Sequence, residues 1–187
     1  DIALMRTIPG MVILNPSDDI EAKAAVKAAY EHEGPVYMRF GRLAVPIIND
    51  RPDYKFEIGK GVTLREGKDV AIIATGLCVS ESLAAAEKLA ADGIDAKVIN
   101  IHTIKPLDED LVVAAAKECG KVVTVEEHSV IGGLGSAVCE TLSRKAPTPV
   151  KNIGVQDCFG ESGPAVALLE KYGLNAEGIY ASVKEFV

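Results

Sequence analysis

Two arginines near the start of the chain are the residues best suited to hold an anion. The segment PVYMRF, residues 35–40, is predicted to form a strand, and Arg39 and Arg42 lie at and just beyond its carboxyl end, beside a glycine. Two guanidinium groups at such a position would form a fork for a phosphate or a carboxylate. Two solvated surface arginines explain the same residues equally well, so the sequence alone leaves both interpretations open.

The stretch EEHSVIGGLGSAV is a second candidate, because three glycines follow a predicted strand. A dinucleotide fingerprint requires G-x-G-x-x-G directly after a strand. Here Val138 stands where the third glycine should be, and the strand is expected to end at about Val125, several residues too early. We therefore interpret Gly132 and Gly133 as a tight turn before a helix, and expect Gly135 or Ala137 to let that helix lie close to the sheet. The start of such a helix still offers free N–H groups to an incidental anion.

The histidines and cysteines do not predict a metal site. His32, His102 and His128 share no metal-binding spacing, and the four cysteines include no C-x-x-C pair. We interpret the cysteines as buried thiols of a protein in a reducing cytoplasm. His128 beside Glu127 is a candidate proton-transfer pair or part of an interface edge. Adjacent strand residues point to opposite faces, however, which argues against the pair.

Composition excludes several classes of function. The chain has 187 residues, 48% of them hydrophobic, and a net charge of −7 without a cluster of Lys and Arg. A nucleic-acid or anionic-membrane surface is therefore not expected. The apolar runs are shorter than the roughly 18 residues that a membrane-spanning helix requires.

Hydrophobic periodicity predicts an α/β protein in three parts. Residues 1–42 read as helix, strand, helix and strand, with a capping box at Asp18 and Glu21. A parallel strand pair this small cannot cover both of its faces, so we interpret it as the tail of a larger α/β domain. Residues 43–69, rich in Pro and Gly with one edge strand, are predicted to be a linker.

Residues 70–187 are predicted to form a complete, doubly wound and mostly parallel sheet, because strands and helices alternate regularly. Strands are expected at about 69–76, 96–101, 121–128 and 150–155, and helices at about 80–92, 108–119, 133–145, 162–172 and 175–186.

Polar residues gather at the carboxyl ends of these strands, where open α/β sheets place their ligands. They include Thr75, Asn100, His102 and Glu126. This edge is either catalytic or a surface that docks on another domain or subunit, and we favour docking.

Several segments, taken together, resemble the C-terminal part of the transketolases. VINIHTIKPLDEDLVVAAAKECGKVVTVEEHSVIGGLGSAV is similar to the core of the family's C-terminal domain, and CFGESGPAVALLEKYGLNAEGIYASVKEFV is similar to its tail. The opening DIALMRTIPGMVILNPSDDIEA resembles the end of the pyrimidine-binding domain. The resemblance covers essentially the whole chain.

The resemblance implies transfer of a two-carbon ketol unit between sugar phosphates, as in the pentose phosphate pathway, with thiamine diphosphate and Mg as cofactors. It implies a dimer whose active sites lie between the diphosphate-binding domain of one protomer and the pyrimidine-binding domain of the other. It divides the chain into a pyrimidine-domain remnant (1–42), a linker (43–69) and the C-terminal domain (70–187). Arg42 matches the arginine that holds the substrate phosphate. Arg39 has no equally firm counterpart in the family.

The resemblance also implies that the cofactor-binding residues lie in a separate N-terminal section or subunit. We therefore expect no catalytic residue in this chain, no cofactor bound by it and no activity from it alone. Two sister enzymes stay open as alternatives: 1-deoxyxylulose-5-phosphate synthase and the β subunit of 2-oxo acid dehydrogenases. FGESGPA favours transketolase over both. A non-catalytic assembly or dimerisation module is the remaining alternative.

Overall fold

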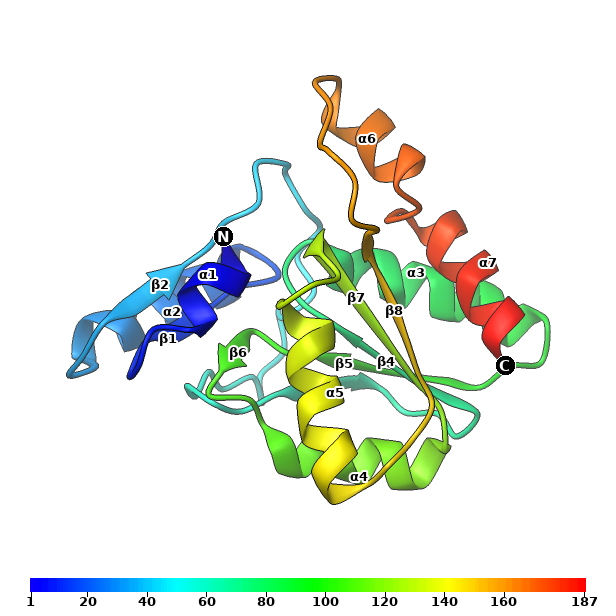
Figure 1. Cartoon of the computed structure of the whole chain (residues 1–187), viewed down its shortest axis with the longest axis horizontal. Helices are drawn as coiled ribbons and strands as arrows, with labels where there is room; N and C mark the ends of the chain where they lie inside the picture. The colour runs from blue at the N-terminus through cyan, green and yellow to red at the C-terminus, as the bar shows by residue number, and fades with distance from the viewer.

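The structure, a computed structural model, describes all residues 1–187, and a five-stranded sheet forms its centre (Figure 1). Its strands are β3 (Val62–Arg65), β4 (Val70–Ala74), β5 (Ala96–Asn100), β7 (Val122–Ser129) and β8 (Val150–Val155). They lie in the order β3-β5-β4-β7-β8, and all neighbours are parallel except β3, which runs antiparallel to β5. The edge strand β3 lies within the segment predicted to be a linker.

Helices cover both faces of this sheet, which confirms the predicted doubly wound fold. The helices are α3 (Cys78–Ala91) and α7 (Ala176–Phe186) on one face, α4 (Glu109–Cys119) and α5 (Leu134–Lys145) on the other, and α6 (Ala165–Lys171) before α7. Alternate residues of β4 serve the two cores: Val70, Ile72 and Ala74 face α3 and α7, whereas Ala71 and Ile73 face α4 and α5. None of the helices is both long and apolar enough to cross a membrane.

The N-terminal segment forms a second, smaller sheet beside the first (Figure 1). Its elements are α1 (Ile2–Arg6), β1 (Val12–Leu14), α2 (Asp19–Glu31) and β2 (Val36–Met38), joined by β6 (Thr103–Lys105). The order is β2-β1-β6, with β2 parallel and β6 antiparallel to β1. Because β6 follows β5 in the chain, the segment shares a sheet with a strand from the larger domain. Strand β6 was not predicted from the sequence, because three residues are too few to show an alternating pattern.

Helix α5 lies close to the sheet at Gly135, one of the two residues expected to allow this approach. A Cβ atom at Gly135 would lie 2.8 Å from Thr124 Oγ1 on β7 and 2.9 Å from Asn152 Oδ1 on β8. These two side chains are joined by a hydrogen bond from Thr124 Oγ1 to Asn152 Oδ1 at 2.8 Å. Even a methyl group at this position would force α5 away from the sheet or break that bond.

We therefore expect Gly135→Ala to destabilise the fold by about 1–2 kcal/mol, because overpacking exceeds the helix propensity that alanine gains. Urea unfolding followed by circular dichroism measures the change. Gly160→Ala is the control, because its added Cβ would meet no atom within 4 Å. A Gly135→Ala protein as stable as the wild type would contradict the close approach.

Candidate functional site

The N-terminal segment occupies the crevice where doubly wound sheets commonly bind ligands. This crevice lies between β4 and β7, because α3 leaves β4 on one face of the sheet and α5 leaves β7 on the other. Asn15, just after β1, lies there: its carbonyl accepts a hydrogen bond from Thr75 Oγ1 at 3.4 Å. Gly76 has a φ of +59°, and a Cβ on it would lie 2.7 Å from Asn15 Nδ2. This part of the edge therefore contacts the N-terminal segment of the same chain.

The buried carboxylate of Glu21 lies at the centre of this contact. Its Oε1 accepts hydrogen bonds from Asn100 Nδ2 at 2.8 Å and from the Tyr54 hydroxyl at 2.7 Å. Its Oε2 accepts from the amide and hydroxyl of Ser17, both at 2.7 Å. Burial and the adjacent Glu21 charge raise the pKa of Tyr54, which keeps its proton for this bond. The capping box and the strand-end Asn100 were recognisable in the sequence, but the hydrogen bond between Asn100 and Glu21 was not predicted.

Asp18 ties the predicted linker to the same contact. It caps α2 by accepting from the Glu21 amide at 2.9 Å, and its other oxygen accepts from the amides of Ile48 and Asn49, both at 2.8 Å. Burial alone would raise the pKa of Asp18, but these amide donors outweigh it and hold the pKa below its usual value. The carboxylate is therefore charged and fixes the start of α2 against the chain that follows β2.

His102 is a structural histidine of this cluster. It is fully buried and stacks on Phe56 with ring centroids 4.2 Å apart. Its Nδ1 lies 2.9 Å from Thr103 Oγ1, and its Nε2 has no partner. Burial lowers the pKa of His102, although the charges of Glu21 and Asp108 oppose the shift. The ring is thus neutral and shielded from solvent.

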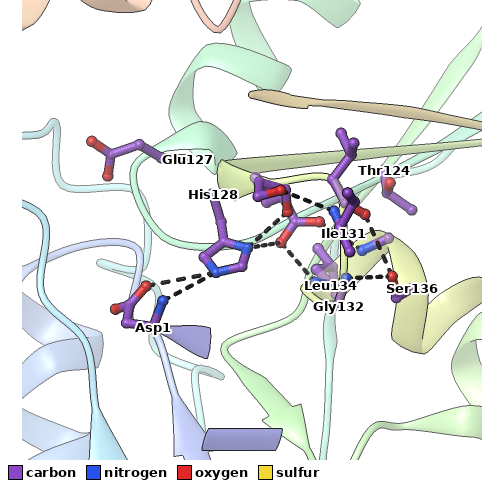
Figure 2. A network of polar contacts seen from close by, with 12 residues as sticks. Asp1, Thr124, Glu127, His128, Ile131, Gly132, Leu134 and Ser136 are labelled. Carbon is purple, nitrogen blue, oxygen red and sulfur yellow. Dashed lines mark hydrogen bonds and ion pairs between the residues drawn. The ribbon is translucent and has the colours of Figure 1, made fainter. Parts of the chain in front are cut away.

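The glycine loop holds a carboxylate from its own chain. Figure 2 shows this network, in which Glu126 Oε2 accepts from the Leu134 amide at 2.7 Å and Oε1 accepts from the Gly135 amide at 2.8 Å. A Cβ at Gly133 would lie only 2.0 Å from Glu126 Oε2, so glycine is required there. The first amides of α5, which bind anions in phosphate-binding loops, are therefore already occupied. Burial raises the pKa of Glu126, although these two amides oppose that effect.

The strand end at about Val125 that was used to judge the glycine loop was wrong, whereas the strand range of about 121–128 agrees with the structure. Strand β7 continues to Ser129, with a register irregularity between Val125 and Ser129. The irregularity breaks the regular alternation, which is the signal that sequence reasoning depends on.

Arg39 forms a clamp with Glu127 and Asp1, which we call the Arg39 clamp. Arg39 Nη1 lies 3.2 Å from Glu127 Oε2, Nη2 donates to the Glu127 carbonyl at 2.9 Å, and Nε donates to Asp1 Oδ2 at 3.0 Å. The Tyr37 hydroxyl donates to the same Asp1 oxygen at 2.8 Å. The clamp joins the end of β2 to the end of β7. Arg39 therefore points into the protein and does not form a fork with Arg42.

His128 and Glu127 do not meet. In Figure 2 the Glu127 carboxylate points away from the His128 ring. His128 Nδ1 donates to the Ser129 carbonyl at 2.7 Å, and the nearest carboxylates are Glu126 at 3.8 Å and Asp1 at 3.7 Å. Burial is the main cause that lowers the pKa of His128. The arrangement thus gives a neutral ring at the seam between the N-terminal segment and β7.

Arg42 is exposed, and no hydrogen bond or ion pair engages its side chain. A neighbouring cleft is lined by Phe40, Gly41 and the carboxylates Asp18 and Asp19, but not by Arg42. Those carboxylates disfavour an anion in the cleft. An anion held by Arg42 would therefore lie outside it, on the exposed side of the loop.

The residues of this chain do not fit thiamine diphosphate and its metal. No group of three or more His, Cys, Asp or Glu side chains is placed to hold a metal ion. The amides most suited to a diphosphate, at the start of α5, bind Glu126 instead. No catalytic step is assigned to the cofactor within these residues.

Comparison with known proteins matches both parts of the chain. The model of the family described as "Transketolase, C-terminal domain" matches residues 59–179, and that of "Transketolase, pyrimidine binding domain" matches residues 1–47. The 6-deoxy-6-sulfo-D-fructose transketolase subunit of Clostridium sp. (strain MSTE9) is 48% identical over 185 residues, which cover 99% of this chain and 57% of that protein. This chain thus spans little more than half of that relative.

More distant relatives and a solved structure extend the comparison. A 1-deoxy-D-xylulose-5-phosphate synthase of Geobacter sulfurreducens is 40% identical over 192 residues, covering 100% of this chain and 30% of the synthase. A solved structure titled "Split gene transketolase, inactive beta4 tetramer" is 52% identical with a TM-score of 0.93. That match covers 98% of this chain and 60% of the other.

The buried neutral His102 predicts sensitivity to acid. Its folded-state pKa lies below the usual 6.5. Just below pH 6.5 the histidine is therefore protonated in the unfolded chain but still neutral in the folded chain. Stability should fall as the pH drops below about 6.5, by at most about 1.4 kcal/mol per pH unit from this residue.

Phenylalanine in place of His102 keeps the stacking on Phe56 but cannot titrate. Urea unfolding at pH 7.5 and 5.5 should therefore show a smaller loss for His102→Phe than for the wild type, with His32→Gln as the control. Parallel losses in wild type and His102→Phe would contradict this assignment.

Proposed function

The chain belongs to the transketolase family, and from this premise we propose that it forms the C-terminal portion of an enzyme that transfers a two-carbon ketol unit between sugar phosphates. The bond between C2 and C3 of a ketose donor breaks, and the unit forms a new bond to C1 of an aldose acceptor. The donor leaves as an aldose two carbons shorter and the acceptor becomes a ketose two carbons longer, without net oxidation. The observation that carries the proposal is the exposed, unpaired Arg42 beyond the end of β2.

Arg42 is the proposed handle for the remote anion of the sugar. A guanidinium group binds a tetrahedral oxyanion through two parallel hydrogen bonds. Binding energy from that distant group positions the reacting carbonyl, so it contributes to the rate without touching the bond that breaks. The relatives' names support such a handle, because 6-deoxy-6-sulfo-D-fructose and 1-deoxy-D-xylulose 5-phosphate both carry a terminal oxyanion.

The cofactors, thiamine diphosphate and Mg, are proposed to be held by an N-terminal section or subunit that joins this chain in a dimer of the complete enzyme. The Clostridium relative is itself named a subunit, and its match covers 57% of its length. The 52% identical structure is titled an inactive beta4 tetramer of a split gene transketolase. Both findings support a chain that is inactive until its partner completes the cofactor site.

The synthase of 1-deoxyxylulose 5-phosphate is the second candidate, because a relative of that name is 40% identical over 192 residues. It would use the same arginine for glyceraldehyde 3-phosphate but take pyruvate as donor. The segment FGESGPA favours transketolase. An assembly module without catalysis would turn over neither set of substrates.

We expect the 187-residue chain alone to bind no thiamine diphosphate, because Glu126 already occupies the amides of the glycine loop and no metal-binding group is present. Isothermal titration with thiamine diphosphate and Mg should give no binding heat, whereas the reconstituted two-part enzyme should bind. Saturable binding by the isolated chain would contradict the proposal that the N-terminal section or subunit holds the cofactors.

In the reconstituted enzyme we expect Arg42→Ala to raise KM for ribose 5-phosphate by about 10- to 100-fold, the equivalent of one charge-assisted hydrogen bond. Release of glyceraldehyde 3-phosphate from xylulose 5-phosphate measures the rate, and kcat should change less than KM. Arg144→Ala, an exposed arginine on α5, is the matched control.

The substrate panel decides between the candidates. Turnover of xylulose 5-phosphate with ribose 5-phosphate supports transketolase. Condensation of pyruvate with glyceraldehyde 3-phosphate, without sugar-to-sugar transfer, moves the assignment to the synthase. An unchanged KM in Arg42→Ala would remove this arginine from the substrate site.

A further inference from the structure

We propose that Glu127, on β7 of the C-terminal domain, is a positioning residue that fixes the substrate-anion arginine Arg42 by holding Arg39. The inference rests on the proposed role of Arg42 and assigns a part in substrate binding to a domain that lacks the cofactor site. Glu127 itself does not touch the substrate in this proposal.

The first step is the fixation of Arg39. Its guanidinium makes contacts on two sides, with the Glu127 carboxylate and carbonyl at 3.2 and 2.9 Å and with Asp1 at 3.0 Å. Its amide donates to the Leu14 carbonyl at 2.8 Å, which continues the pairing of β2 with β1 by one residue. Arg39 is therefore fixed at both its main chain and its side chain. Only 21% of the side chain is exposed.

The second step is the short loop from Arg39 to Arg42. Gly41 lies against the C-terminal domain, where an added Cβ would be 3.4 Å from Leu77 Cδ2. Beyond Arg42, Leu43 and Val45 pack on the core formed by α3, α7 and the large sheet. Arg42 is thus an unpaired side chain on a loop whose two ends are both anchored to the C-terminal domain. The Arg39 clamp is the polar anchor of one end, and Leu43 and Val45 are the apolar anchors of the other.

The third step is the charge balance. Without the Glu127 carboxylate, Arg39 would keep the Glu127 carbonyl and Asp1 but lose its one ion pair with β7. With one contact fewer, Arg39 fixes the end of β2 less firmly, and the loop that carries Arg42 three residues later gains freedom that substrate binding must remove. A partly exposed ion pair contributes at most about 1 kcal/mol to stability. Its removal should therefore leave the enzyme folded, so that a change in substrate binding is measurable.

The test uses the reconstituted enzyme and Glu127→Gln, which keeps the size of the side chain and the carbonyl contact but removes the charge. We expect KM for ribose 5-phosphate to rise about 3- to 10-fold with kcat nearly unchanged. With D-ribose, which has no phosphate, the two enzymes should not differ.

Glu140→Gln is the matched control. Glu140 on α5 pairs with Arg6 at 2.7 Å and also joins the N-terminal segment to the C-terminal domain, but far from Arg42 along the chain. It should affect thermal stability as much as Glu127→Gln does and leave KM unchanged. In an Arg42→Ala background, Glu127→Gln should add no further rise in KM, because the two act on one interaction.

Each result decides a separate question. If Arg42→Ala raises KM and Glu127→Gln does not, the positioning role is overturned and the proposed function stands. If Glu127→Gln raises KM equally for D-ribose or in the Arg42→Ala background, its effect is structural and the inference also fails. If Arg42→Ala has no effect, the proposed handle and the inference fall together.

Discussion

Buried carboxylates set the relation between the two parts of this chain. A buried charge is costly unless it is fully hydrogen-bonded, and Glu21 reaches that state only when Ser17 from its own segment, Asn100 from the large sheet and Tyr54 from the connecting chain surround it. Any sliding of the N-terminal segment would leave the charge unpaired. The docking is therefore defined by a polar contact that apolar packing alone would not specify. The shared strand β6 extends the same attachment through main-chain hydrogen bonds.

The consequence is that the usual ligand crevice of a doubly wound sheet is used to hold protein. The loop after β4 meets Asn15, and the helix start after β7 binds Glu126. Free amides at helix N-termini commonly bind phosphates. Here the amides at the start of α5 bind the carboxylate of Glu126 instead, and the glycines of the loop leave room for that carboxylate. On the segment docked at this edge, Arg42 alone of the two candidate arginines is left unengaged.

The sequence predicted the features that depend on local patterns. The four parallel strands, the helices on both faces, the cap at Asp18 and the close approach at Gly135 all follow from periodicity, capping and glycine placement, and all are present. Features that depend on distant partners were not predictable. Strand β6 is too short to show a period, and nothing local in Arg39 reveals that a glutamate 88 residues away takes its charge. The residue types and their position did not distinguish Arg39 from Arg42, and the family resemblance favoured Arg42. The tertiary contacts add that Arg39 is engaged and Arg42 is not.

That separation explains how one strand end can supply both an anchor and a free charge. An arginine that binds substrate must keep its donors free, but its position must also be restricted before binding. Ordering a long side chain on binding costs about 2 kcal/mol, and ordering a mobile loop adds to this cost. In this protein the two arginines have separate roles. Arg39 donates hydrogen bonds to Glu127 and Asp1 and thereby holds the backbone, while the donors of Arg42 stay exposed on the loop that follows. Since the carboxylate on β7 belongs to the C-terminal domain, the positioning role proposed for Glu127 would let that domain shape substrate affinity through the Arg39 clamp.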